Sequence, residues 1–412
     1  MRYLRRTLEE TVRSAMRHFP AILVTGPRQS GKTTMLRHGW EKTHRFVSLE
    51  QPAVRERALR DPDAFFKDNP PPVILDEIQY APRILHHVKT MIDEHRKPGQ
   101  WLMTGSQGFP VMRNVSQSLA GRVAVLTLMP LSVGECGGAP AGRATMKNLI
   151  AGLLDRPPRR ADAHGSAKRD LGDWLLRGGY PELRTKPGMS SVLWCASYVN
   201  TYLERDVRSL IRIGDLSAFG RFLRLCAART GQVLNLSDIA RDAGVTVMTV
   251  KKWLSVLEAS FQVFLLPPYF RNVHKRLIKA PKLYFTDTGV AAYLTGIREK
   301  ETAMQGPMAG ALVETAVVSA WWKAFLHRGL PPTMYYWRTR DGFEVDLLVE
   351  YDGKLHPMEI KAASTLTPHH GSSVERWLAG QGGKDDRGLV FGNIDAPHSL
   401  SAAVSAVPWH WI

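Results

Sequence analysis

Short runs of apolar residues alternate with helix-like stretches in the first third of the chain. Residues 21–25, 73–76 and 100–104 each form such a run, and residues 122–129 supply another. Because strands that alternate with helices build parallel sheets, this rhythm predicts a buried parallel sheet. We therefore expect residues 1–135 to fold as an α/β unit.

The pattern changes after residue 135. Residues 136–170 are rich in glycine, proline and basic residues, which indicates a linker that contains a short helix. A helical pattern then extends from residue 173 to about residue 259, and strands and a further helix follow. We expect a linker with a helical lid, a middle unit and a C-terminal α/β unit at residues 136–215, 216–295 and 300–412.

The composition is that of a globular protein, since 44% of the 412 residues are hydrophobic and 23% are charged. No apolar stretch approaches the roughly twenty residues that a membrane span needs. Residues 1–20 carry charges where a secretory signal has its apolar segment. The three scattered cysteines argue against a disulfide framework or a zinc module. These features predict a cytoplasmic protein without membrane contact.

The chain is strongly basic, because 55 Lys and Arg face 38 Asp and Glu, a formal net charge of +17. Such an excess favours a polyanionic partner, most often nucleic acid. The alternative is a proteome that is basic throughout, so charge alone leaves DNA binding open.

A glycine-rich loop follows the first predicted strand and precedes a helical segment, and it fits the pattern G-x-x-x-x-G-K-[ST]. Backbone amides of such a loop wrap phosphates, Lys32 can reach the β- and γ-phosphates, and the Thr33 hydroxyl can ligate Mg²⁺. A chance match in a glycine turn is the alternative. The residues expected to bind ATP are Gly26, Pro27, Arg28, Gln29, Ser30, Gly31, Lys32, Thr33 and Thr34.

Two acidic residues end the second apolar run. Asp76 would emerge at the carboxyl end of the strand, where it can hold the Mg²⁺ shell, and Glu77 would orient or deprotonate the attacking water. The pattern is common by itself and specific after the glycine-rich loop. The two acids together favour ATP hydrolysis over binding alone.

Further residues are candidates for assisting hydrolysis. Thr104 or Ser106, after the third strand, could sense the γ-phosphate or the water, although an ordinary strand-to-loop turn explains them equally well. Arg122 could be an arginine finger delivered in trans, with Arg28 as the alternative. A finger in trans would require a homo-oligomer, and a structural role stays open for both arginines.

The middle unit has the pattern of a helix-turn-helix. A helical stretch ends at Gly244, and a second one spans residues 247–259. With the following hairpin this order predicts a winged helix that binds DNA, and the alternative is a lid that packs on the ATPase. The residues expected at DNA are Met248, Thr249, Lys251 and Lys252 on the second helix and Arg271, His274, Lys275, Arg276 and Lys279 in the hairpin connection.

Near the C-terminus, Asp352-Gly353 is the preferred turn of a two-residue hairpin between strands at 342–351 and 354–363. Counting outward from the pair Tyr351 and Lys354 gives the register. Val345, Leu347 and Val349 then face Ile360, Met358 and His356 on a mostly apolar face. On the other face Asp346 lies opposite Glu359, and Glu344 lies opposite Lys361.

Directly opposed carboxylates repel unless a cation lies between them. Asp346 and Glu359 would hold Mg²⁺, and Lys361 would position water or steady a phosphate. Together they complete the D-x(n)-E-x-K core of PD-(D/E)xK nucleases, and Glu314, on a helix at 310–322, could be the accessory acid. A solvated hairpin of mixed charge is the alternative, and DNA cleavage stays open even if the fold is right.

Nearly the whole chain resembles prokaryotic AAA+-type ATPases that end in a domain of unknown function 4143. The stretches that carry the resemblance are residues 26–34, 76–79, 104–106, 120–122, 178–181, 281–289, 344–346 and 359–361. The resemblance implies an α/β fold class with a P-loop AAA+-type parallel-sheet domain, a winged-helix middle domain and a C-terminal PD-(D/E)xK nuclease-like domain. The long stretch before residue 173 departs from the pattern and leaves the lid boundary open.

The leading hypothesis is a Mg²⁺-dependent ATPase that acts on DNA, including branched or forked DNA, with ATP and Mg²⁺ as cofactors. The alternative is an ATP-switched DNA-binding regulatory protein without nuclease activity. Protein remodelling is a third reading, which the basic charge and the lack of an evident substrate-threading loop disfavour.

Overall fold

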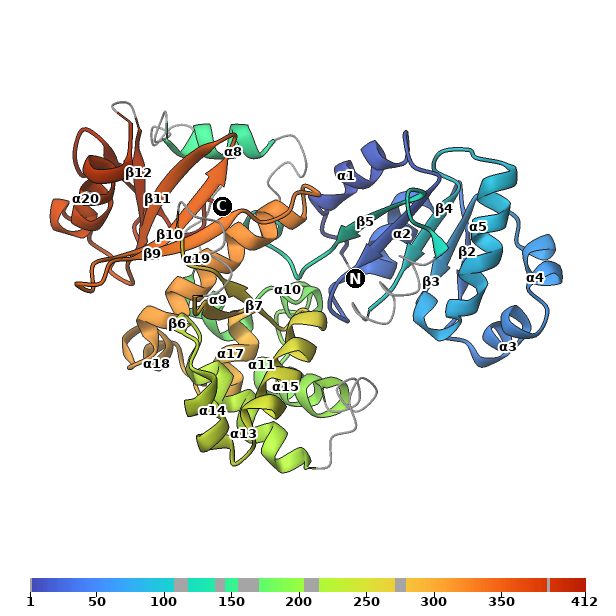
Figure 1. Cartoon of the computed structure of the whole chain (residues 1–412), viewed down its shortest axis with the longest axis horizontal. Helices are drawn as coiled ribbons and strands as arrows, with labels where there is room; N and C mark the ends of the chain where they lie inside the picture. The colour runs from blue at the N-terminus through green and yellow to red at the C-terminus, as the bar shows by residue number, and fades with distance from the viewer. Residues whose placement is uncertain are drawn as a thin grey trace.

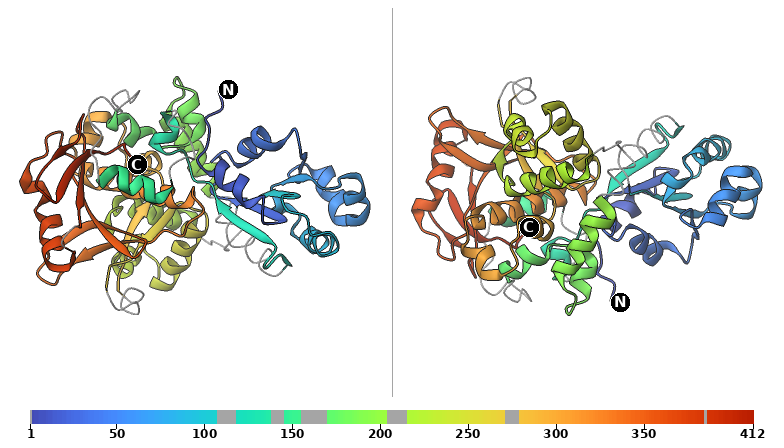
Figure 2. Two further views of the ribbon diagram at one scale, coloured as in Figure 1. Left: turned by 90° about the horizontal axis from the view of Figure 1, so that it is seen from above. Right: turned by 90° about the horizontal axis from the view of Figure 1, so that it is seen from below.

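The computed structural model describes residues 2–106, 118–137, 145–154, 170–203, 215–270, 279–383 and 386–412. The N-terminal α/β unit, in blue, lies at one end of an elongated molecule, and the middle and C-terminal units form the other end (Figure 1, Figure 2). The predicted contacts of Arg271, His274, Lys275 and Arg276 lie outside the described residues.

The N-terminal unit is built on a parallel sheet of five strands in the order β2-β3-β4-β1-β5. Its strands are β1 (Ala21–Thr25), β2 (Arg45–Ser48), β3 (Val73–Asp76), β4 (Trp101–Thr104) and β5 (Val123–Thr127). Strands β1 and β3 have the predicted bounds. Strand β2 is an addition that the apolar pattern did not indicate, because it lies at the sheet edge and only Val47 of its residues is buried.

Helices cover both faces of this sheet, and each face has its own apolar cluster. One face packs against α1 (Leu8–Ala15) and α2 (Lys32–Trp40). The other packs against α3 (Pro52–Arg60), α4 (Pro62–Asp68) and α5 (Leu85–Glu94). The strands β1, β3 and β4 are therefore buried on both sides, which explains why they are continuous apolar runs.

The middle of the described chain is mainly helical. Its helices are α7 (Val133–Cys136), α8 (Met146–Leu154), α9 (Leu171–Arg177), α10 (Pro181–Thr185), α11 (Ser191–Tyr198), α13 (Leu216–Ala228), α14 (Leu236–Ala243), α15 (Val247–Ala259), α17 (Thr288–Leu294) and α18 (Lys300–Gln305). A small antiparallel sheet in the order β6-β8-β7 accompanies them, with β6 (Gln232–Val233), β7 (Val263–Leu266) and β8 (Lys282–Phe285). Gly244, with φ of 72°, ends α14 as predicted.

The C-terminal unit has a mixed sheet of six strands in the order β13-β14-β12-β11-β10-β9. Its elements are α19 (Ala309–Leu326), β9 (Met334–Arg338), β10 (Glu344–Tyr351), β11 (Lys354–Ile360), α20 (Ser372–Gln381), β12 (Gly388–Gly392), β13 (His398–Ser399) and β14 (Val404–Pro408). Helix α20 packs on one face of the sheet and α19 on the other. The cluster around α19 continues into the middle helices, so these two units share one core.

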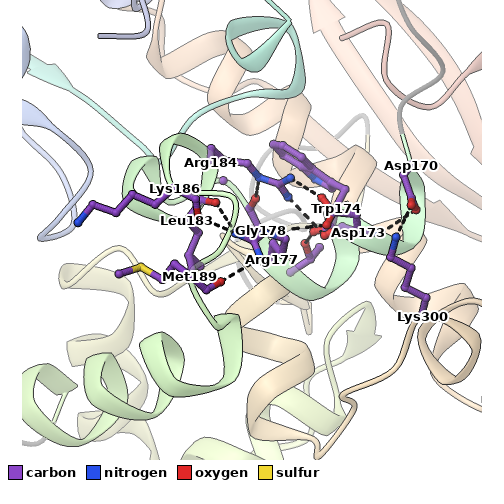
Figure 3. A network of polar contacts seen from close by, with 12 residues as sticks. Asp170, Asp173, Trp174, Arg177, Gly178, Leu183, Arg184, Lys186, Met189 and Lys300 are labelled. Carbon is purple, nitrogen blue, oxygen red and sulfur yellow. Dashed lines mark hydrogen bonds and ion pairs between the residues drawn. The ribbon is translucent and has the colours of Figure 1, made fainter. Parts of the chain in front are cut away.

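Two arginines join α9 to α10 (Figure 3). Arg177 donates to the backbone oxygens of Leu183 and Met189, at 2.6 and 3.0 Å, and Arg184 donates to the backbone oxygen of Gly178 at 2.5 Å. Gly178 has φ of 62°, and a Cβ there would lie 1.9 Å from an Asp287 carboxylate oxygen. The two glycine-containing stretches at 178–181 and 281–289 therefore meet in space and fix α9 against α17.

Candidate nucleotide site and acidic site

The glycine-rich loop lies between β1 and α2, at the carboxyl edge of the parallel sheet. Gly26 has φ of 135°, and a Cβ at this position would lie 2.2 Å from the backbone oxygen of Leu128. Gly31, with φ of 95°, starts α2. Only glycine fits both conditions without strain, so the loop has the shape that lets its amides face a phosphate.

Lys32 is folded over this loop. Its Nζ donates to the backbone oxygens of Gly26 at 3.1 Å and Pro27 at 2.8 Å. The side chain is buried, so the ammonium would exchange these oxygens for phosphate oxygens without leaving the loop. Lys32 is thus the first residue of α2, and its ammonium group lies against the glycine-rich loop.

Asp76 lies at the end of β3 and accepts hydrogen bonds from two hydroxyl groups. Thr33 Oγ1 donates to Asp76 Oδ1 at 2.6 Å, and Thr104 Oγ1 donates to the same oxygen at 2.8 Å. Burial raises the pKa of Asp76, and the two hydroxyls act in the opposite direction. Mg²⁺ prefers oxygen ligands, and the hydroxyl of Thr33 and the carboxylate of Asp76 lie side by side. These two residues therefore fit the predicted ion.

Glu77 follows with φ of 57°, a left-handed backbone that is unusual for a residue with a side chain. Ser106 Oγ donates to its two carboxylate oxygens, at 2.8 and 2.9 Å. Gln79 Nε2 also donates to the carboxylate, a contact that the sequence analysis missed although Gln79 stands in one of the recognised stretches. The predicted water-activating acid and the predicted sensor therefore touch.

Arg122 lies at the opposite edge of the sheet. It immediately precedes β5, which runs parallel to β1, so it is on the amino side and away from the glycine-rich loop. Its Nε and Nη2 donate to Asp93 at 2.5 and 3.0 Å, and this contact raises the pKa of Arg122. Arg122 can thus reach only another molecule's nucleotide, and its role as a finger stays a prediction.

A buried network, which was not predicted from the sequence, connects the glycine-rich loop to the far end of α19. Arg6 donates to the backbone oxygens of Ser30 and Met129, at 2.8 and 2.6 Å. Its Nε lies 3.3 Å from Glu135, and Glu135 lies 3.4 Å from Nδ1 of His327. Burial opposes ionisation of Glu135, but the charge of Arg6 and the contact with His327 hold the pKa of this carboxyl well below its usual range.

A second group of charged residues lies on the C-terminal hairpin, where the register has the predicted pairs. Tyr351 pairs with Lys354, Val349 with His356, and Leu347 with Met358. The turn at Asp352 and Gly353 has positive φ at both residues, 52° and 73°, as the two-residue hairpin requires.

The prediction that Val345 shares the apolar face of Leu347 is wrong. The pairing of β10 with β9 shifts between Val345 and Leu348, so one extra residue bulges from β10. Val345 therefore packs with Leu348 under α20, whereas Leu347 packs on the α19 side. Bulges re-aim side chains next to functional sites, and this one lies at Asp346.

Asp346 and Glu359 lie close together, as expected. Asp346 Oδ2 accepts from the backbone N–H of Ile360 at 2.9 Å, and Lys361 Nζ donates to Glu359 Oε1 at 2.6 Å. Burial raises the pKa of Glu359 to about 8, and the charge of Asp346 adds to the effect. Oε2 of Glu359 is buried without a hydrogen-bond partner.

Glu314 joins this group from α19, and its role as an accessory acid stays a prediction. Burial, followed by the charge of Asp346, raises the pKa of Glu314 to about 7. Its main partners were not foreseen, because Lys282 and Tyr284 of β8 both donate to Glu314 Oε1. Lys282 Nζ also lies 2.5 Å from Glu344 Oε1, an ion pair that the sequence did not indicate.

The acidic site, as described, is not a preformed metal site. Within the described ranges, no group of three or more His, Cys, Asp or Glu is arranged to hold a metal ion. Asp346 and Glu359 offer the oxygens that a hard divalent cation prefers, and their predicted metal role depends on a rearrangement of the lysines.

The surface of α15 carries exposed polar and apolar side chains. Met248 is 63% exposed, and Lys251 and Lys252 are exposed, whereas Thr249 is half-buried. Thr246 caps the helix through the backbone N–H of Thr249 at 3.1 Å. One face of α15 is thus buried in the core, and Lys251 and Lys252 on its other face are exposed to solvent.

Family models match three consecutive parts of the chain. The model of an AAA domain matches residues 18–137, and that of the domain of unknown function DUF4143 matches residues 309–412. The chain thus contains one part that is similar to an AAA domain and, at its C-terminal end, one part that is similar to DUF4143. The middle part, residues 168–301, matches the domain of unknown function DUF8612. The nucleotide site lies in the AAA domain, and Asp346 and Glu359 lie in the DUF4143 domain.

Relatives resemble the chain over most of its length. "Uncharacterized protein Rv2008c" of Mycobacterium tuberculosis and "Uncharacterized protein Mb2031c" of Mycobacterium bovis are each 29% identical over 367 residues, which is 88% of this chain and 74% of theirs. Within the described residues, no helix is both long and apolar enough to cross a membrane.

Among solved structures, the Walker-type ATPase PABY2304 of Pyrococcus abyssi aligns at 16% identity with a TM-score of 0.42, over 71% of this chain and 96% of that one. DnaA from Aquifex aeolicus bound to AMPPCP aligns at 15% identity with a TM-score of 0.25, over 61% and 85%. At these scores the likeness carries no argument about function.

Proposed function

We propose that the protein is a Mg²⁺-dependent AAA-type ATPase that hydrolyses ATP to bind and remodel or process DNA, including branched or forked DNA, with a nuclease-like DUF4143 domain. The observation that carries the proposal is the meeting of Lys32, Thr33, Asp76 and Glu77 at one edge of the AAA sheet, with Ser106 against Glu77. A phosphate-binding loop, an ion site and a base are the parts that hydrolysis of a triphosphate needs.

Each of these side chains has a role in that reaction. Lys32 binds the β- and γ-phosphates, and Thr33 and Asp76 would hold Mg²⁺, which when bound stabilises the charge that develops on the phosphates. Glu77 orients the attacking water and accepts its proton. Ser106 and Gln79 hold the Glu77 carboxylate in place.

The DNA partner is inferred from the middle unit and the charge. Strand β6 precedes α14, helices α14 and α15 meet at the Gly244 turn, and β7 and β8 follow to complete a small antiparallel sheet, which is an order of elements typical of a winged helix. Lys251 and Lys252 on the exposed face of α15 would meet phosphates, and the net charge of +17 supports a polyanion.

We expect DNA to raise the rate of ATP hydrolysis, and DNA binding to depend on α15. Replacing Lys251 and Lys252 by alanine should remove two phosphate contacts and lower the slope of log affinity against log salt by about 2. The matched control replaces Lys42 and Lys67, two exposed lysines of the AAA domain, and should leave the slope unchanged. Titrating labelled DNA at several salt concentrations checks this, and equal slopes in the two double variants would contradict the DNA interface.

DNA cleavage by the DUF4143 domain is expected with Mg²⁺ or Mn²⁺ and should disappear in Asp346→Asn. This variant keeps the size of the side chain and removes the charge that a cation would meet. Flap, forked and branched substrates are incubated with the wild type and the variant, and the products are separated on denaturing gels. Cleavage that survives in Asp346→Asn would come from a contaminant or another site.

The second candidate function is an ATP-switched DNA-binding regulatory protein that does not cleave. It is favoured by one observation, the engagement of the acids by lysines: Lys282 pairs with Glu314 and Glu344, and Lys361 pairs with Glu359. Under this function every substrate stays intact in the cleavage experiment while ATP still alters DNA affinity.

A further inference from the structure

The stretch at 281–289 belongs to the middle unit, yet its side chains enter the acidic site of the DUF4143 domain. Strand β8 lies against α19, and Lys282 and Tyr284 point from β8 to the same carboxylate of Glu314. Lys282 is only 4% exposed, and Tyr284 is fully buried. This pair therefore connects the two units through a polar contact inside their common core.

The ammonium group of Lys282 has the surroundings of a bound cation. Its Nζ lies 2.9 Å from Glu314 Oε1 and 2.5 Å from Glu344 Oε1, and these oxygens come from two different elements, α19 and β10. The face of the Tyr336 ring lies 5.6 Å from the same nitrogen. Lysine thus supplies, from a third element, a positive charge that links the two carboxylates, and Arg338 Nη1 lies 3.7 Å from the other oxygen of Glu344.

The carboxyl groups of the acidic site outnumber the two lysines that contact them. Asp346 lies beside Glu359, and Lys361 contacts only Oε1 of Glu359. Glu359 is 5% exposed, and its Oε2 is buried with no hydrogen-bond partner. A buried carboxylate oxygen without a partner is costly, so this position favours the arrival of a further cation.

We propose that Lys282 is a built-in competitor of a divalent cation: its ammonium holds the place of the metal between Glu314 and Glu344 and leaves when a divalent cation binds the acidic site. The inference rests on the proposed nuclease-like role of this site, whose ion it regulates. Entry of the ion then requires β8 to release Glu314, so the middle unit controls whether the DUF4143 domain is loaded.

The competition follows from geometry and charge. Two carboxylates that share one lysine charge can share the double charge of Mg²⁺ or Mn²⁺ more favourably, but the two cations cannot occupy the same place. A sequence without Lys282 would leave Glu314 and the partly exposed Glu344 to repel each other, and a divalent cation would relieve that repulsion.

The test is Lys282→Met, which keeps the length of the side chain and removes its charge. Mn²⁺ binding to the full chain without nucleotide is measured by isothermal titration calorimetry, and melting is followed with and without Mn²⁺. We expect the variant to bind Mn²⁺ at least about ten-fold more tightly than the wild type, and to gain more thermal stability from the ion. Lys282→Arg, which keeps the charge, and Lys279→Met, an exposed lysine of the same segment, should behave like the wild type.

A second variant tests whether the additional Mn²⁺ binding occurs at the acidic site. Adding Asp346→Asn to Lys282→Met should abolish the tighter Mn²⁺ binding, and binding that persists would overturn the proposal because the ion is then elsewhere. Equal Mn²⁺ affinity in Lys282→Met and the wild type would also overturn it. If Lys282→Met unfolds, rescue by Mn²⁺ supports the competition, and failure of rescue makes Lys282 a structural ion pair only.

These readouts are independent of DNA cleavage. A chain that binds Mn²⁺ as expected but cuts no DNA contradicts the nuclease-like function and leaves the competition standing. A chain that cuts DNA with unchanged Mn²⁺ affinity in Lys282→Met contradicts the competition alone.

Discussion

Replacing Glu77 by glutamine is expected to lower the rate of ATP hydrolysis by about 10²- to 10⁴-fold, the range that a positioned general base contributes. Glutamine keeps the size of the side chain and its contact with Ser106 but cannot accept the proton of water. ATP affinity should stay close to that of the wild type, because the loop residues and Lys32 are untouched. Phosphate release in steady state and nucleotide binding by fluorescence titration separate the two quantities.

The matched control for Glu77→Gln is Glu94→Gln, an exposed acid of the same AAA domain, which should hydrolyse ATP normally. Ser106→Ala is the informative neighbour, since it leaves the base in place and removes the hydroxyl that holds it. We expect Ser106→Ala to lose much less activity than Glu77→Gln. If Glu77→Gln turned over ATP at the wild-type rate, Glu77 would not be the base and another group would have to activate water.

The nucleotide site was predictable because its residues are close in sequence to the strands that carry them. Strand β1 delivers the glycine-rich loop and β3 delivers Asp76 and Glu77, so finding the apolar runs located the acids. The parallel order of the sheet then brings both strand ends to one edge. The contact of Gln79 with the Glu77 carboxylate was not predicted, because it depends on the left-handed backbone conformation of Glu77.

The hairpin register was predictable for a similar reason. The turn residues Asp352 and Gly353 admit one short loop, and a period of two residues then fixes each pair up to Leu347 and Met358. The count failed at Val345, because the bulge arises from the pairing of β10 with β9. The sequence of β10 contains no signal for the bulge. A register counted outward from the turn therefore continues in regular pairs past the position of the extra residue.

The contacts of Lys282 and of Arg6, which join different units of the chain, were not predicted from the sequence. Lys282 reached Glu314 and Glu344 because the middle unit and the DUF4143 domain share a core, a fact that appears only when the helices are packed. Arg6 lies in a charged N-terminal segment whose sequence shows no sign of a buried ion pair. Its partner Glu135 marked the end of a predicted domain and turned out to be buried.

Helix α19 connects the two sites physically. Glu314, near its start, contacts Lys282 in the acidic site, and His327, just after its end, contacts Glu135 beneath the glycine-rich loop. Thirteen residues of helix separate them by about 20 Å. Arg6 donates to the backbone oxygen of Ser30 in the glycine-rich loop. A nucleotide that moves this oxygen would therefore act on the end of α19 near His327, and the other end of the same helix carries Glu314 of the acidic site.

Breaking the pair of Arg6 and Glu135 is expected to destabilise the protein by about 3–5 kcal/mol, because either partner is left as an unpaired charge in a buried place. Arg6→Leu and Glu135→Leu are measured by urea unfolding at neutral pH. Since the pKa of Glu135 lies below its usual range, its contribution is complete above the pKa of an unfolded carboxyl and is lost only as the pH falls through the lower folded value.

The double variant decides whether the two residues act together. Two leucines bury no charge, so the loss in Arg6→Leu with Glu135→Leu should be clearly smaller than the sum of the single losses. The control cycle is Arg37 and Glu41, an exposed pair on α2, where both single variants should change little. Additive losses would mean that Arg6 stabilises the fold through the backbone oxygens of Ser30 and Met129 alone. In that case His327 and α19 would have no charged connection to the loop that binds ATP.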